Sequence, residues 1–174
     1  MEMSRLLNAM SKFYRMTLNK GKILSTIGEE LEHARLYMRI QCAIHNGEPS
    51  EEVYEVSEDL IDYHIPTLIL QPLVENAVEH GFGSIGFENG KLGISVGLED
   101  GQIVIRVSDN GVGISKEAAA AVLDPQEESA PGYGLRNVYH RLRLLFEDEF
   151  SMSFETGESG GTSVVIRVPP YVQP

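Results

Sequence analysis

Three short segments of the chain carry residues that could bind a flat, charged ligand. In the first, Asn76 and His80 are four residues apart, which places them on one face of a helix, with Glu75 and Glu79 on an adjacent face. The amide oxygen of Asn76 is a ligand that a hard cation such as Mg²⁺ accepts, together with waters and nucleotide phosphates. The alternative is a solvated polar edge on an amphipathic helix.

The second segment, residues 109–114 (DNGVGI), directly follows an apolar run that predicts a buried strand. Gly111 and Gly113 would let the backbone come close to a flat ligand. An ionised Asp109 at the end of the sheet can accept a hydrogen bond from the exocyclic amine of a purine. The alternative is a plain strand-to-helix turn, which Asp, Asn and Gly also suit, although a turn needs fewer glycines.

The third segment, residues 132–135 (GYGL), opens a predicted helix. Glycine-rich backbone at a helix N-terminus, here at Gly132 and Gly134, presents free N–H groups and a positive dipole end to phosphate oxygens. A lone Gly-x-Gly is weak evidence. It lacks the preceding strand of a dinucleotide-binding turn and the Gly-Lys-Ser/Thr of a P-loop.

Hydrophobic periodicity and turn residues predict the elements that must position these segments. Thr26 and Glu29 have the spacing of a capping box, Asp100-Gly101 is a hairpin signal, and Pro72 requires its helix to begin near Gln71 or to kink. The predicted helices are 4–18, 26–44, 65–80 (with Pro66 in its first turn), 116–123 and 135–146; the predicted strands are 52–57, 92–98, 103–107, 150–155 and 163–168. The order predicts an α+β, two-layer sandwich with a mixed, mostly antiparallel sheet and one helical layer, preceded by a partial helical hairpin.

Several of these elements have a predicted buried face, among them the second helix and the strand 92–98. On the second helix the face consists of Leu31, Ala34, Tyr37, Met38 and Cys42, the last as a small buried hydrophobe. On the strand 92–98 it consists of Leu92, Ile94, Val96 and Leu98.

Composition and charge exclude several classes of protein. The chain has 174 residues, with 14 Lys+Arg against 26 Asp+Glu and a net charge of −12, which disfavours binding to nucleic acid or to anionic lipid. One cysteine excludes an internal disulfide and a cysteine-cluster zinc site. No apolar run approaches the roughly 20 residues that span a bilayer, and no signal pattern opens the chain. We expect a soluble, cytoplasmic, acidic domain.

Order and spacing of the three segments resemble those of the ATP-binding domain shared by histidine kinases, gyrase, Hsp90 and MutL, the Bergerat fold. Residues 70–81 (LQPLVENAVEHG) look like its N box, 109–113 its G1 box and 132–135 its G2 box, with Gly160-Gly161-Thr162 following on the last hairpin. The first run and "GYGLRNVYHRLRLLF" are similar to LytS-type sensor histidine kinases. The resemblance covers about residues 25–168.

The resemblance implies a role for each of these residues in binding Mg·ATP. Asn76 would hold Mg²⁺, and Asp109 would bind the adenine amino group. The other implied contacts are the close approach allowed by Gly111 and Gly113, a water-mediated contact of Thr162, phosphate contacts at Gly132, Gly134 and Leu135, and phosphate donation by His80.

The resemblance further implies transfer of the γ-phosphoryl group to a histidine upstream in a longer parent protein. The acceptor lies in an "NPHFLYN"-like run in these kinases, and no such run surrounds His33, His45, His64 or His140. We therefore expect residues 1–46 to be the end of the dimerisation and phosphoacceptor region and residues 47–174 to be the ATP-binding domain.

Partners are implied as well. They are the upstream phosphoacceptor domain, a response regulator that acts through the parent, and a second copy that pairs through Leu6, Met10 and Phe13; nucleic acid is not expected. Truncation before Gly28 should then leave a monomer. The parent would be anchored in the cell membrane.

Two positions depart from the pattern of many histidine kinases. Pro72 and Glu79 stand where those kinases have a second Asn and a Lys. Pro72 also cannot serve as the Glu base of gyrase-type relatives, which argues against ATP hydrolysis as the main reaction. Two alternatives stay open: a serine kinase of the same fold that regulates a sigma factor, and an interaction domain that has lost nucleotide binding.

Overall fold

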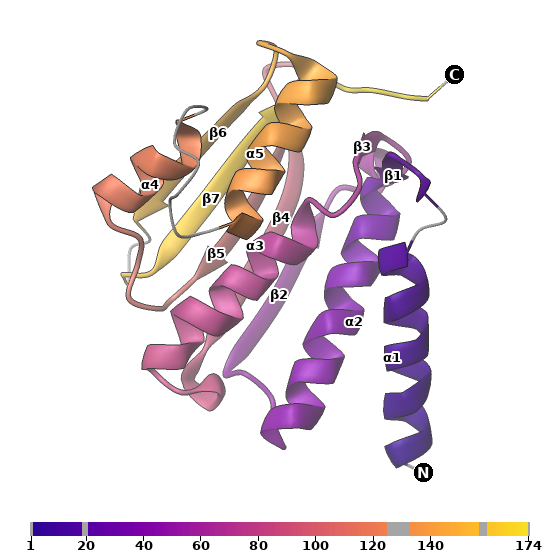
Figure 1. Cartoon of the computed structure of the whole chain (residues 1–174), viewed down its shortest axis with the longest axis vertical. Coiled ribbons are helices and arrows are strands. Elements are labelled where there is room, and N and C mark those ends of the chain that lie inside the picture. Colours follow the sequence, from indigo (N-terminus) through magenta and orange to yellow (C-terminus); the bar gives the residue numbers. More distant parts are fainter. Residues whose placement is uncertain (1, 19–20, 125–132, 157–159, 174) are drawn as a thin grey trace.

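One five-stranded sheet, covered on one face by helices, forms the body of the protein (Figure 1). The computed structural model describes residues 2–18, 21–124, 133–156 and 160–173. The strand order is β2-β4-β5-β7-β6, with β2 parallel to β4 and every other pair antiparallel. The strands are β2 (Glu51–Val56), β4 (Lys91–Glu99), β5 (Gln102–Asp109), β6 (Ser151–Thr156) and β7 (Thr162–Val168). The predicted two-layer α+β sandwich is confirmed.

The β4–β5 hairpin shows how local sequence sets the register of the sheet. Asp100 (φ 50°) and Gly101 (φ 79°) both adopt positive φ, as a two-residue type I′ turn requires. Val96 is buried on the helical side as predicted, but Leu98 is 58% exposed, so its predicted burial is wrong. The pairing of β2 with β4 ends at Val96, so Leu98 has no strand beside it on that edge.

Five α-helices in the described part of the chain complete the main architecture. They are α1 (Glu2–Leu18), α2 (Ile27–His45), α3 (Leu70–Asn76), α4 (Lys116–Leu123) and α5 (Tyr133–Phe146), with short 3₁₀ turns at Glu58–Leu60, Phe82–Ser84 and Phe87–Asn89 and a π-helix at Ala77–Gly81. Helices α2, α3 and α5 lie on the sheet, and α1 lies outside α2 (Figure 1). None of the described helices is long and apolar enough to cross a bilayer.

The predicted helix 65–80 is wrong at its beginning. Ile65 and Pro66 belong instead to β3 (His64–Pro66), which pairs with β1 (Leu24–Thr26) in a small second sheet. Pattern alone could not find strands of three residues. Helix α3 begins at Leu70, so Pro72 lies in its first turn, where a missing N–H has no intrahelical partner to lose.

Helix α2 begins with the predicted capping box. Thr26 Oγ1 accepts from the Glu29 N–H at 3.1 Å, and Glu29 Oε2 accepts from the Thr26 N–H at 3.0 Å. The four other predicted apolar residues of its face are buried in the same core as α3 and the sheet: Leu31, Ala34, Tyr37 and Met38. Cys42 is only partly buried, so its predicted burial is wrong, although desolvation raises the pKa of its thiol.

Helix α1 contacts α2 along one side and leaves apolar side chains uncovered on the other. Phe13 stacks on His33 with ring centroids 4.6 Å apart, and Lys12 pairs with Glu32 at 2.8 Å. Among the described side chains of α1, three apolar ones are exposed: Leu7, Tyr14 and Leu18. The predicted helical hairpin therefore forms, and one of its faces has no partner among the described residues.

Candidate functional site

The end of β5 carries a carboxylate that is held in place by backbone N–H groups. Asp109 Oδ1 accepts from the Gly111 N–H at 2.8 Å and from the Thr162 N–H at 3.4 Å. Burial raises the pKa of Asp109, and these two N–H groups partly offset that shift. The second oxygen, Oδ2, has no partner among the described residues, so it can accept from a ligand.

Glycines let three distant segments meet around this carboxylate. A Cβ built on Gly111 would lie 2.2 Å from the Cα of Gly81, and one on Gly161 would lie 2.0 Å from the backbone oxygen of Asp109. Real Cβ atoms do not approach that closely, so the N box, the G1 box and the last hairpin can touch only without side chains. Gly113 adopts a φ of 82°, which glycine tolerates best.

Sequence reasoning did not assign Gly81 or Gly161 to the site. The available signal was their place beside the motifs, since Gly81 ends the run 70–81 and Gly161 directly precedes Thr162. Thr162 itself is buried, with a 4% exposed fraction, and its N–H reaches the predicted carboxylate. The structure thus brings Asp109, Gly111 and Thr162 together.

The side chain of Asn110 stabilises the same loop by hydrogen bonds, a role that the sequence did not predict. Its Oδ1 accepts from the Lys91 N–H at 2.7 Å, and its Nδ2 donates to the Asn89 carbonyl at 3.0 Å. Both bonds tie the loop to the beginning of β4. The loop is therefore held in shape before any ligand arrives.

Asn76 and His80 lie on one continuous helical run, as predicted, but its last turn is a π-helix and not the regular α-helix that the sequence suggested. Asn76 is the last residue of α3 and is half-buried, whereas His80 lies in the π-helix Ala77–Gly81 and is exposed. The Phe82 N–H donates to the Ala77 carbonyl, five residues back, which widens the turn. Such π turns occur frequently at functional sites. Neither the Asn76 amide nor the His80 ring has a hydrogen-bond partner in the described part of the chain.

The beginning of α5 lies against the beginning of α3. A Cβ on Gly134 would lie 3.4 Å from the Cβ of Pro72. Leu135 is buried in the core, so only its backbone can face a ligand. Arg136 is also buried; its Nη2 donates to the Asp124 carbonyl at 3.4 Å, and its Nη1 has no hydrogen-bond partner within the described ranges. Gly132 lies outside the described residues.

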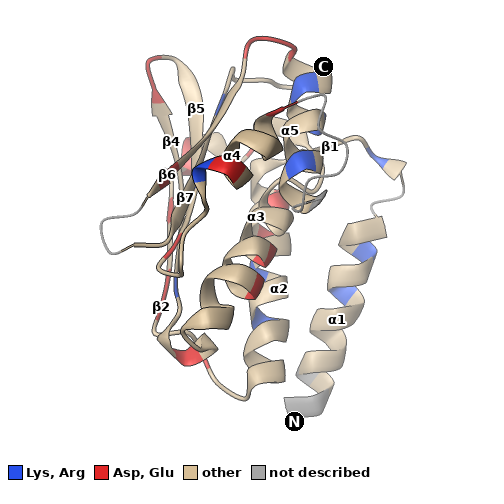
Figure 2. Ribbon diagram, turned by 60° about the vertical axis from the view of Figure 1, so that its left-hand side comes forward, with Lys and Arg blue, Asp and Glu red and all other residues tan. Residues whose placement is uncertain are grey.

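Charge differs between these two neighbouring helices. Figure 2 shows acidic residues in red on α3 and the π-helix that follows it, and basic residues in blue on α5. Of the basic residues of α5, Arg136 lies near the beginning of the helix, where a phosphate would also meet helix N–H groups even though the whole protein is acidic. Within the described residues, no group of three His, Cys, Asp or Glu side chains could hold a metal ion. A cation at Asn76 would therefore need phosphate oxygens and waters as its other ligands.

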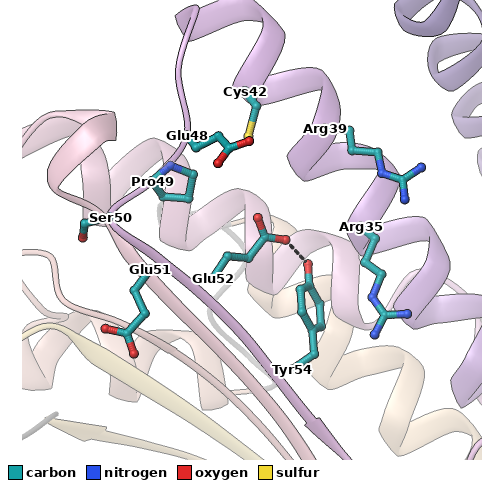
Figure 3. A pocket seen from close by; sticks show the side chains of 9 residues that line it. All are labelled: Arg35, Arg39, Cys42, Glu48, Pro49, Ser50, Glu51, Glu52 and Tyr54. Carbon is teal, nitrogen blue, oxygen red and sulfur yellow. Dashed lines mark hydrogen bonds between the residues drawn. The ribbon is translucent and has the colours of Figure 1, made fainter.

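A separate groove lies between α2 and the edge strand β2 (Figure 3). The Arg35 guanidinium lies over the Tyr54 ring, 4.6 Å from its centroid, and the Tyr54 hydroxyl donates to Glu52. Burial, and next this hydrogen bond, raise the pKa of Tyr54. None of the predicted site residues lines this groove, so it is distinct from the candidate nucleotide site.

A carboxylate and a glycine cradle at the end of a strand, in contact with a helix that ends on a half-buried Asn, are features of one class of ATP-binding domain. Residues 62–172 match the family of histidine kinase-, DNA gyrase B-, and HSP90-like ATPases, and the chain belongs to that family. Within the family it is a LytS-type histidine kinase ATPase domain, as its relatives show.

Among these relatives, the sensor histidine kinase BtsS of Escherichia coli K12 is 27% identical over 166 residues, which cover 95% of this chain and 28% of that protein. The sensor histidine kinase/phosphatase LytS of Staphylococcus aureus is 34% identical over 161 residues, which cover 90% of this chain and 27% of that protein. The chain thus spans little more than a quarter of the length of these relatives.

Solved structures show the same fold. The catalytic domain of histidine kinase ThkA superimposes with a TM-score of 0.57 at 15% identity, covering 86% of this chain and 97% of that one. Full-length ShkA in complex with AMPPNP superimposes with a TM-score of 0.60 at 19% identity, covering 97% of this chain and 36% of that one. At these identities the likeness concerns the fold alone.

Proposed function

We propose that the chain binds Mg·ATP and presents its γ-phosphoryl group to a histidine in the upstream part of a longer sensor kinase. The single observation that carries the proposal is the Asp109 carboxylate. Its Oδ1 is occupied by two N–H groups of the surrounding backbone, which leaves Oδ2 as an acceptor for the 6-amino group of adenine.

The remaining residues fit the other parts of the nucleotide. Gly111 and Gly113 keep the cradle free of side chains, and Thr162 lies beside Asp109, where its hydroxyl would assist through a water. Asn76 offers an amide oxygen to Mg²⁺, and Gly134 lies at the α5 end where phosphates meet helix N–H groups.

Three further residues complete the proposed set. His80 is exposed beside Gly81 and would donate to a phosphate, Leu135 would serve through its backbone, and Gly132 would border the phosphates. When bound, Mg²⁺ would neutralise phosphate charge, and the protein would position the γ-phosphoryl group. Together these two effects are most of what phosphoryl transfer requires.

The chain would work as one part of a larger assembly. Residues 1–46 are then the end of the dimerisation and phosphoacceptor region, and residues 47–174 are the ATP-binding domain. The proposed partners are the upstream phosphoacceptor domain, a response regulator reached through the parent, and a second copy that pairs through α1. The sequence suggested Leu6, Met10 and Phe13 for that pairing, but Phe13 stacks on His33 of the same chain, so the exposed side of α1 is the surface now proposed. The domain would lie in the cytoplasm, with the parent anchored in the membrane.

Calorimetric titration with two nucleotides tests the adenine contact. ATP with Mg²⁺ should bind, whereas inosine triphosphate, which carries a 6-oxo group in place of the 6-amino group, should bind at least about tenfold more weakly, because it has no donor for Asp109. Equal affinity for the two nucleotides would refute the assignment of Asp109.

A labelling experiment tests the missing acceptor. The chain incubated with γ-labelled ATP and Mg²⁺ should not label itself, because none of its histidines lies in an acceptor run. A stable, acid-labile phosphate on the purified chain would contradict this.

A further inference from the structure

A buried carboxylate on α2 takes no part in the proposed nucleotide contacts. Glu30 is 3% exposed, and four donors surround it. Its Oε1 accepts from the Leu68 N–H and the Ser25 hydroxyl, both at 2.8 Å. Its Oε2 accepts from the N–H groups of Ile69 at 2.8 Å and Leu70 at 3.0 Å. Glu30 therefore caps the beginning of α3 from a different helix.

The turn that receives this carboxylate has an unusual backbone. Leu68 has a φ of 58°, in the left-handed region that leucine rarely adopts, and Ile69 follows with φ −93° and ψ −52°. A left-handed residue followed by a right-handed one aims successive N–H groups at a single point, which is an anion-binding geometry. Glu30 supplies the anion at that point, so it stabilises a turn that is otherwise strained.

Helix α5 holds the same turn from the other side. Arg141 Nη1 donates to the Thr67 carbonyl at 2.6 Å and lies 3.5 Å from the Leu68 carbonyl. The N–H side of the turn is thus bound by α2 and its carbonyl side by α5. Because one side chain is anionic and the other cationic, each suits the backbone groups that it meets.

Both halves of the proposed site are attached to this turn. Helix α3 begins here and reaches Asn76 six residues later, about 9 Å along its axis. Helix α5 brings Gly134 against Pro72, in the first turn of α3. A displacement of the turn would move the proposed Mg²⁺ ligand relative to the proposed phosphate end.

Helix α2 is in turn held by elements on both of its other sides. His33, one turn after Glu30, stacks on Phe13 of α1, and its Nε2 lies 3.0 Å from the Thr17 hydroxyl. On the side of the groove in Figure 3, Arg35 packs over Tyr54 of β2. The position of Glu30 thus depends on how α1 and α2 pack.

We propose that Glu30 is a positioning residue: through the turn 67–70 it sets the place of α3, and so passes changes in α1 and α2 to the nucleotide site. The proposal rests on the proposed nucleotide function, because its effect at the site is measured as a change in affinity for Mg·ATP. The positioning itself is measurable without nucleotide.

Glu30→Gln is the test, and Glu32→Gln is its matched control. The glutamine amide would keep the shape of the carboxylate but turn an NH₂ group toward backbone N–H donors. Glu32 lies on the same helix, is partly exposed, and pairs with Lys12 rather than with the turn. In the full chain, at a temperature where both variants are folded, Glu30→Gln should weaken Mg·ATP binding by about tenfold or more, and Glu32→Gln by less than about twofold.

Amide hydrogen exchange gives a second readout that a general loss of stability would not produce. Glu30→Gln should speed exchange in α3 by about tenfold relative to exchange in β5, whereas lower global stability would speed both segments alike. Wild-type ATP affinity together with an unchanged α3-to-β5 ratio would overturn the proposal.

Two further outcomes are informative. If the wild-type chain does not bind ATP, the proposed function fails, and the exchange ratio alone decides whether Glu30 positions α3. If Glu30→Gln does not fold, Glu30→Asp, which keeps the charge on a shorter side chain, is judged by the same two measurements. Full wild-type behaviour of Glu30→Asp in both would then overturn the proposal, because a shorter side chain cannot hold the turn in its place.

Discussion

Replacement of Asp109 by Asn changes one oxygen and one charge at the adenine end of the proposed site. Asn would keep an oxygen at Oδ1 for the Gly111 and Thr162 N–H groups, at 2.8 and 3.4 Å, and would place an NH₂ group at Oδ2. The 6-amino group of adenine would then meet a donor. Loss of a hydrogen bond to a charged group costs about 1.5–3 kcal/mol, so ATP affinity should fall by about ten- to 150-fold.

The fold should survive this substitution, because the native carboxylate is not a stabilising charge. Burial raises the pKa of Asp109 in the folded state. Between its unfolded and folded pKa the folded state binds more protons than the unfolded state, so the contribution of Asp109 to stability falls as the pH rises through that range. Above the folded pKa the ionised group costs stability, and a neutral Asn removes that cost. Thermal unfolding at pH 7 should show no large loss of stability.

The assay is calorimetric titration of both proteins with Mg·ATP and Mg·ITP. Compared with the native protein, the variant should bind ATP more weakly and ITP more tightly, because the NH₂ group of Asn can donate to the 6-oxo group of ITP. Burial raises the pKa of Asp109, so lowering the pH through that pKa should protonate the carboxylate and weaken ATP binding by the native protein. The variant has no carboxylate at this position and should lose less affinity. Its own pH dependence therefore measures the part that comes from titration of ATP. Unchanged ATP affinity in a folded variant would refute the adenine assignment.

Three further substitutions test other parts of the structure. Gly111→Ala should abolish ATP binding and lower the free energy of unfolding by about 1–3 kcal/mol, because its Cβ would lie 2.2 Å from a neighbouring Cα; Gly97→Ala, with nothing within 4 Å, is the control. Asn76→Ala should weaken Mg·ATP by about tenfold and leave adenosine binding unchanged, as calorimetry would show; an equal loss for adenosine would contradict a role in Mg²⁺ binding. The double substitution of Leu7 and Tyr14 by Glu should convert a dimer to a monomer in light scattering, and an unchanged dimer mass would exclude that face of α1.

Surface substitutions on α1 are a cleaner test of dimerisation than truncation before Gly28. That cut would also remove β1, which pairs with β3, and the Thr26 cap of α2. It would further remove Ser25, which donates to Glu30. A change in mass after truncation would therefore mix loss of an interface with loss of structure.

Features that depend on neighbours in the chain were predicted well. The helix Lys116–Leu123, the capping box at Thr26 and the turn at Asp100 all follow from side chains within a few residues of one another. The position of Asp109 at the end of a buried strand was equally accessible, because an apolar run and a following glycine pair mark such a site. Family resemblance then supplied the expected role of each motif residue.

Features that depend on distant contacts were not predicted. Strands β1 and β3 are too short for a periodic pattern and form because they pair with each other. The sequence predicts an ordinary α-helix up to His80, whereas the structure has a π turn at Ala77–Gly81. This turn places Gly81 against Gly111, a contact that lies far away in the sequence. The sequence gives no signal for the role of Glu30, since a single charged residue on a helix carries no sign of the N–H groups that it meets in the fold.

The sequence by itself thus determined the motifs, their order and most of the elements, because caps, turns and hydrophobic periods act over a few residues. Only the tertiary structure decided which glycines meet around Asp109 and which helix holds the turn before α3. Those contacts join residues 30 to 52 positions apart, and they are selected by close packing of the whole chain rather than by any local preference.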